Sequence, residues 1–121
     1  MSTILFVQIS LEERNDIFDA TIKTDIGEIR WTFESDRSCC ECFGVELSQP
    51  LASLVGKKLI NIDFNDVSEK DDSWTYTNTG ILTIKLEDGD WTARFYNIHN
   101  GYYAHNLDII IDGKTKWNIS L

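Results

Sequence analysis

The chain has 121 residues, of which 42% are hydrophobic, and its 20 acidic and 11 basic residues give a net charge of −9. This length and composition suit one globular domain and exclude the low hydrophobicity that is typical of disordered chains. Because a net negative charge repels phosphate backbones, we expect no direct contact with nucleic acid, and the charge suits a partner with a basic surface, although many proteins are acidic merely for solubility.

The sequence shows no pattern of a membrane-spanning helix or of a secretory signal. No apolar run approaches the roughly 20 residues that a membrane-spanning helix needs, and the first residues lack the pattern of a secretory signal. The single Pro and the seven Gly form no linker-like stretch. We therefore expect a single domain over residues 1–121, located in the cytoplasm and not attached to a membrane.

Strand patterns dominate the first third of the chain. Residues 3–9 and 17–24 are rich in β-forming side chains, and residues 28–34 alternate apolar with polar positions, so that Trp31 falls on the buried face. Asp, Ile and Gly at 25–27 supply a short turn. Residues 17–34 are therefore predicted to form a β-hairpin.

One helix candidate follows. Ser48 suits a helix N-cap, Pro50 falls in the first turn, and Leu51 and Leu54 share a face before Gly56 ends the pattern. A strand pattern resumes at residues 58–64. Residues 65–73 are acidic and almost without large apolar side chains, which predicts a mobile surface loop.

Two Asp-Gly pairs mark further hairpins. One lies between the alternating runs 82–86 and 91–95, and the other joins residues 107–111 to residues 115–121. The expected fold is therefore α+β and β-rich, with a mainly antiparallel sheet of about seven strands and one or two short helices.

Two groups of residues are candidates for binding a partner. The acidic residues of the predicted loop fit a basic surface, and the Tyr pair after the turn at Asn100-Gly101 offers rigid contact area, although buried Tyr also caps cores. The predicted partner-binding residues are Glu69, Asp71, Asp72, Tyr102 and Tyr103.

A small-molecule site is the first alternative. Aromatic rings stack on nucleobases and an arginine meets phosphate, so a nucleotide-binding protein would use aromatic and polar residues close to one turn. The residues proposed for this site are Trp91, Arg94, His99, Asn100, Tyr102 and Tyr103.

A zinc or thiol site is the second alternative. The three cysteines fall within residues 39–42, an odd count that argues for reduced thiols, and adjacent cysteines lack the spacing of a zinc knuckle. No catalytic motif stands out, so we expect no enzyme activity, no bound metal and no cofactor. The weak candidates for metal ligands are Cys39, Cys40, Cys42, His99 and His105.

Two short motifs carry a family resemblance. Cys39-Cys40-Glu41 and Asn100-Gly101-Tyr102-Tyr103 resemble the paired motifs of a domain-of-unknown-function family of small phage and bacterial proteins. The resemblance implies a phage origin but transfers no catalytic or ligand residues, because the family has no assigned activity. Together with the charge, it leads by analogy to an inhibitor of a host defence nuclease, similar to an anti-CRISPR protein.

Overall fold

A computed structural model describes residues 2–9, 18–25, 27–34, 42–71, 75–99 and 105–121. Nine β-strands and one 3₁₀-helix lie among these residues. In chain order they are β1 (Ser2–Ile9), β2 (Asp19–Thr24), β3 (Glu28–Phe33), β4 (Cys42–Leu47), η2 (Leu51–Leu54), β5 (Lys58–Asp71), β6 (Thr75–Leu86), β7 (Gly89–His99), β8 (Asn106–Ile111) and β9 (Lys114–Ser120).

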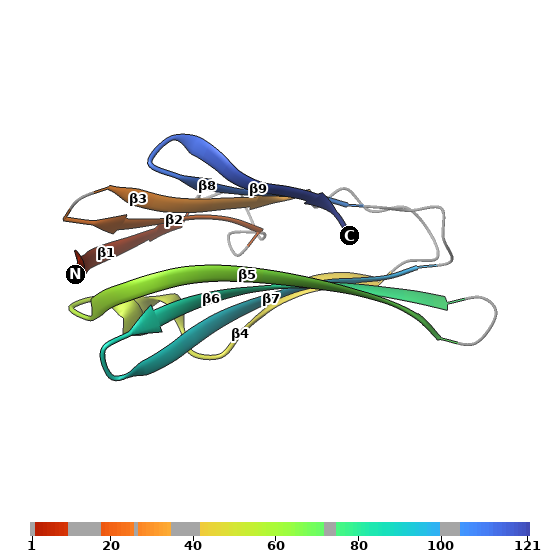
Figure 1. The fold of residues 1–121 in the computed structure, drawn as a ribbon, viewed down its shortest axis with the longest axis horizontal. Coiled ribbons are helices and arrows are strands. Elements are labelled where there is room, and N and C mark those ends of the chain that lie inside the picture. Colours follow the sequence, from red (N-terminus) through yellow and green to blue (C-terminus); the bar gives the residue numbers. More distant parts are fainter. Residues whose placement is uncertain (1, 10–17, 26, 35–41, 72–74, 100–104) are drawn as a thin grey trace.

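The strands form two antiparallel layers that face each other (Figure 1). One layer has the order β4-β7-β6-β5 and the other β2-β3-β8-β9. Strand β1 links them, because it pairs along most of its length with β2 and through Ser2 and Thr3 with β5. The arrangement is a β-sandwich, which buries the inner side of each layer.

The core lies between the layers and is rich in aromatic rings. Trp31 of β3 stacks on Trp91 of β7 with ring centroids 6.1 Å apart, and Phe33 meets Phe95 edge to face at 5.6 Å. All four rings are buried. Alternation along β3 and β7 places these side chains on one face of each strand, so the predicted burial of Trp31 is confirmed.

The predicted α+β class is wrong, because the fold is all-β in the described part of the chain. The helix expected after Ser48 is the single 3₁₀ turn η2, in which Leu51 and Leu54 are buried. Apolar residues three apart share a face in a 3₁₀ turn as well as in an α-helix, and extended backbone at Val55 ends the turn. No helix in the described residues is long and apolar enough to cross a membrane.

All three predicted hairpins are confirmed by the strand pairing. In the β8–β9 hairpin Ile111 pairs with Lys114, and the two loop residues have positive φ, 53° at Asp112 and 78° at Gly113. This is the geometry that an Asp-Gly pair favours. In the β6–β7 hairpin Leu86 pairs with Gly89, so Gly89 begins the strand instead of lying within the loop.

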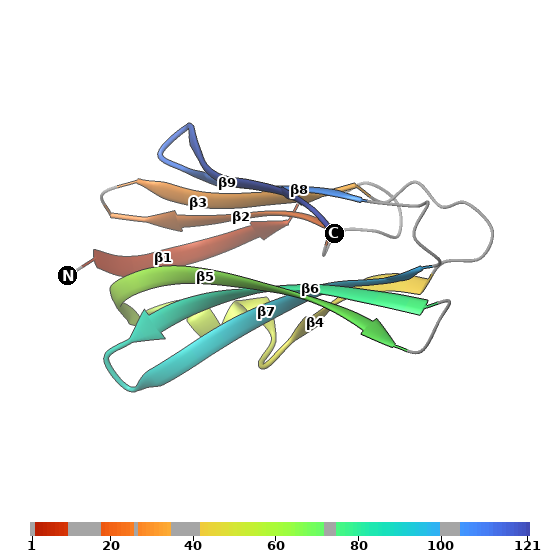
Figure 2. The ribbon, with the colours of Figure 1, turned by 45° about the vertical axis from the view of Figure 1, so that its right-hand side comes forward.

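The predicted acidic loop at residues 65–73 is also wrong over most of its length. Strand β5 continues to Asp71 and pairs with β6 along the whole stretch (Figures 1 and 2). Residues 72–74 lie outside the described part of the chain. Asp66, Glu69 and Asp71 therefore belong to a strand, whose backbone fixes their spacing.

Candidate functional site

Strand β5 separates from β1 soon after it begins. Ser2 pairs with Leu59 and Thr3 with Lys58, and β1 then continues along β2. Beyond this point each pairing that the structure describes for β5 is with β6 on its other side. We call residues 60–71 the β5 edge, because one side of this backbone has no strand neighbour among the described residues.

The β5 edge is exposed on both faces where it leaves the core. Within residues 58–69, the part of β5 whose burial the structure describes, Phe64 is the last buried residue, and the five residues 65–69 are all exposed. Among the side chains of this strand that the structure describes, three carboxylates are exposed, those of Asp63, Asp66 and Glu69. At a rise of about 3.3 Å per residue their Cα atoms are roughly 10 Å apart, and alternation places Asp66 on the opposite face from the other two.

Pairing with β6 holds the β5 edge in an extended conformation. The Ser68 hydroxyl donates a hydrogen bond of 2.6 Å to Oδ1 of Asn78 across the two strands. Val67 lies opposite Thr79, which in turn lies opposite Tyr96 of β7. Val67 is 51% exposed, so an apolar side chain lies on the open face between the acidic positions.

Two of the three acidic residues predicted for partner binding fall at the far end of this strand. Glu69 is exposed on β5, Asp71 is the last residue of the strand, and Asp72 lies outside the described residues. Sequence reasoning missed Asp63 and Asp66, which the structure places on the same strand as Glu69. The sequence signal for this strand extension was the polar stretch that follows residues 58–64, and we interpreted that stretch as a loop.

The comparisons with known proteins give one match, to a domain family. The family DUF7448, described as a domain of unknown function, matches residues 5–109 and so covers most of the chain. The chain belongs to the DUF7448 family. No curated protein and no solved structure matches it. The predicted membership of a family of unknown function is confirmed, and the matched part of the DUF7448 domain includes the whole β5 edge.

The DUF7448 structure places Trp91 and Arg94, two of the residues proposed for a nucleotide site, on opposite faces of β7. Trp91 is 2% exposed and its indole N–H donates to the Gln49 carbonyl at 3.0 Å. Arg94, three residues further along β7, lies on the opposite face, pairs with Glu46 at 3.1 Å and covers the ring of Tyr96. His99 ends β7, whereas Asn100, Tyr102 and Tyr103 lie outside the described residues.

Only some of the Cys and His candidates lie in the described part of the chain. Cys39 and Cys40 lie outside the described residues, and Cys42 is the first residue of β4. His105 is buried, its Nδ1 donates a hydrogen bond of 2.7 Å to the Glu34 carbonyl, and its ring stacks on Phe43. No group of three His, Cys, Asp or Glu side chains suited to a metal ion occurs within the described part of the domain.

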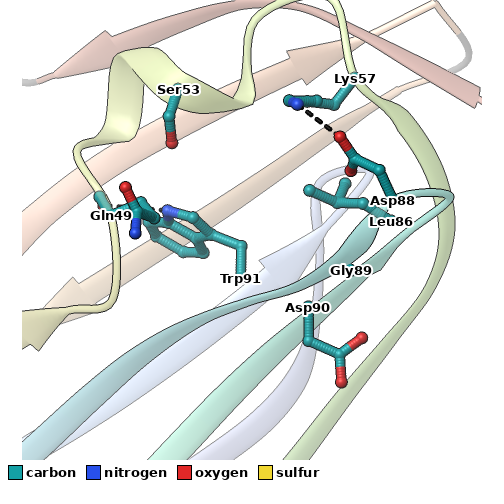
Figure 3. A pocket seen from close by; sticks show the side chains of 8 residues that line it. All are labelled: Gln49, Ser53, Lys57, Leu86, Asp88, Gly89, Asp90 and Trp91. Carbon is teal, nitrogen blue, oxygen red and sulfur yellow. Dashed lines mark hydrogen bonds and ion pairs between the residues drawn. The ribbon is translucent and has the colours of Figure 1, made fainter.

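A hollow of about 250 Å³ lies beside η2 and the β6–β7 turn (Figure 3). Its lining residues are Gln49, Ser53, Lys57, Leu86, Asp88, Gly89, Asp90 and Trp91. Lys57 contacts Asp88 at 2.5 Å, and this hydrogen bond is the main reason that the pKa of the Asp88 carboxyl lies below its usual value of 3.8. An anionic ligand would have to displace Asp88 from Lys57, so this hollow does not favour a phosphate.

Proposed function

We propose that this DUF7448 domain is a non-catalytic binding protein that occupies a basic surface of a larger protein. The observation that supports the proposal is the row of exposed carboxylates on the β5 edge, within a chain of net charge −9. Paired backbone fixes these charges in place, in contrast to charges on a loop. A fixed pattern of charge selects a partner whose cations have a matching arrangement.

Electrostatics would act mainly on the encounter with the partner. Complementary charge raises association rates, and salt screens the attraction beyond about 8 Å at physiological ionic strength. The three carboxylates are exposed and therefore keep their hydration until the partner arrives. Binding through the β5 edge should accordingly be fast at low salt and slower at high salt.

The proposed target is the nucleic-acid-binding surface of a host defence nuclease, in the manner of an anti-CRISPR protein. Such surfaces use Lys and Arg to neutralise phosphates, and carboxylates compete for the same cations. This step rests on analogy, as does the proposal that the protein is phage-encoded and acts in the host cytoplasm. Cys39-Cys40-Glu41 and Asn100-Gly101-Tyr102-Tyr103 are the proposed signature of its phage and bacterial relatives.

A DNA-cleavage assay with a panel of RNA-guided nucleases tests this function. We expect the wild-type protein to inhibit at least one nuclease, and the variant with Asp63→Lys, Asp66→Lys and Glu69→Lys to lose inhibition. The matched control carries Glu34→Lys, Glu87→Lys and Asp90→Lys, which reverse three exposed acids elsewhere and give the same net charge. The control should inhibit like the wild type.

Two outcomes would contradict the proposal. If the two triple variants inhibit equally, the β5 edge has no special role, and if no nuclease is inhibited, the proposed target class is wrong. Association rates measured at two ionic strengths distinguish this proposal from the competing hypothesis of an aromatic binding site at Tyr102 and Tyr103. That hypothesis predicts that Tyr102→Ala and Tyr103→Ala abolish binding at any salt concentration, whereas reversal of the β5 edge has no effect.

A further inference from the structure

The β5 edge offers backbone groups as well as charge, because one of its sides has no strand neighbour in the described part of the chain. Strand β5 has 14 residues, and the described pairing with β1 involves the first two. Strands at the ends of the sheet order are shorter, since β4 has six residues and β9 has seven. A long strand edge presents a row of backbone N–H and C=O groups, and these can pair with another extended chain.

Charged residues, the usual protection of such an edge, are present, but most of them are acidic. Natural proteins protect exposed edges with charged side chains, and Lys is the commonest choice. β9 follows this pattern, because Lys114 and Lys116 are exposed. The sequence of the β5 edge instead carries four acidic residues, Asp63, Asp66, Glu69 and Asp71, and one basic residue, Lys70. Its net negative charge repels acidic chains and attracts basic ones.

We propose that the β5 edge binds a basic, extended segment of a protein partner as an added β-strand. Backbone hydrogen bonds would supply affinity, as in other cases of strand addition. Carboxylates on both faces of β5 would select the segment, because Lys or Arg side chains directly opposite them form favourable cross-strand pairs. Val67, which is exposed, would contact an apolar side chain of the segment.

The charges on this chain favour such a segment over a second copy of the protein. The basic edge of β9 could pair with the acidic β5 edge of another molecule. However, each copy carries a net charge of −9, so two copies repel each other as they approach. A short basic segment of another protein brings no such repulsion. The inference rests on the proposed function and adds to it the form of the partner.

Two synthetic peptides provide a direct test. One has Lys at every third position and Thr elsewhere, so that its lysines match the spacing of Asp63, Asp66 and Glu69, and it has the length of the β5 edge. The other is identical except that alternate backbone amides are N-methylated, so that one edge of the peptide cannot donate hydrogen bonds. Both carry the same charge. We expect the N-methylated peptide to bind the full-length domain about tenfold or more weakly, because lost backbone hydrogen bonds weaken binding cumulatively.

Hydrogen exchange and a neutral variant complete the experiment. Binding of the first peptide should slow amide exchange within residues 60–69. The variant with Asp63→Asn, Asp66→Asn and Glu69→Gln should bind this peptide at least about tenfold more weakly, whereas the control with Glu34→Gln, Glu87→Gln and Asp90→Asn should bind it like the wild type. These amide side chains are nearly isosteric, so the fold should be retained.

The results separate the two proposals. Equal binding of both peptides, with affinity that still depends on the three carboxylates, would overturn strand addition and leave the charge-based function intact. Equal binding by the neutral variant and the wild type would contradict both proposals. Sedimentation that shows dimers disrupted by Lys114→Glu and Lys116→Glu would identify a second copy as the occupant and overturn the inference.

Discussion

Gly80 marks the point at which the core ends along β5 and β6, and its replacement by alanine should destabilise the fold. A Cβ atom at this position would lie 2.7 Å from Cζ of Phe64 and 3.4 Å from Cδ1 of Ile119. The Phe64 ring is 8% exposed and lies against Trp117, with ring centroids 5.7 Å apart. The ring therefore has little space into which it could move to avoid an added methyl group.

The size of the effect follows from two opposing contributions. Overpacking a well-filled core typically costs about 1 to 3 kcal/mol. Gly→Ala offsets about 0.4 to 1 kcal/mol of this cost, because it reduces the conformational entropy of the unfolded chain. We expect Gly80→Ala to lower the free energy of unfolding by about 1 to 2 kcal/mol, and Tm by roughly 4 to 8 °C for a chain of this size.

Gly44 of β4 provides a matched control. A Cβ atom there would lie 2.7 Å from the hydroxyl oxygen of Tyr96, a distance equal to the closest contact at Gly80. Tyr96 lies on the outer face of its layer and is partly exposed, so its terminal hydroxyl can move outward. Gly44→Ala should change the free energy of unfolding by less than about 0.5 kcal/mol. Urea titrations measure both variants, and equal losses of stability would refute the described packing of Phe64 over Gly80.

Two further predictions concern the core and the hollow beside η2. Trp31→Ala should lower the free energy of unfolding by about 3 to 5 kcal/mol, because the indole is fully buried between Trp91 and Phe95; an unchanged urea midpoint would contradict this. Lys57→Met should return the pKa of Asp88 towards 3.8, as followed by NMR titration of the carboxyl. A carboxyl whose pKa is lower in the folded than in the unfolded state stabilises the fold at pH values above the unfolded-state pKa. This stabilisation is lost as the pH falls through the folded-state pKa, so the variant should lose less stability than the wild type on acidification below about pH 4.

The hairpins could be predicted from the sequence because their signals are local. Alternation in β3 and the Asp-Gly pair before β9 each depend on a few neighbouring residues. The helix prediction failed because Leu51 and Leu54 fit a single 3₁₀ turn equally well. Strand β4 was not predicted, although Phe43, Val45 and Leu47 alternate with smaller or charged residues, because three apolar positions are a short signal.

The extension of β5 could not be predicted in the same way. Residues 65–69 are exposed on both faces, so they lack the apolar alternation by which a strand is recognised. What keeps them extended is pairing with β6, which is itself held by β7 on its other side. Pairing of this kind depends on residues distant in the sequence, and composition alone makes the segment resemble a loop.

The departure of β1 from β5 likewise leaves no local signal, yet it determines the candidate site. An exposed strand gains little from apolar burial, and each ladder hydrogen bond contributes only about 0.5 to 1.5 kcal/mol net. We therefore expect the far end of β5 to open more readily than the core strands, and to do so by separating from β6. A partner strand on the free side would give β5 two neighbours. Binding would then stabilise the segment that carries the carboxylates. The carboxylates that select the partner and the backbone that positions them would therefore become ordered in the same step.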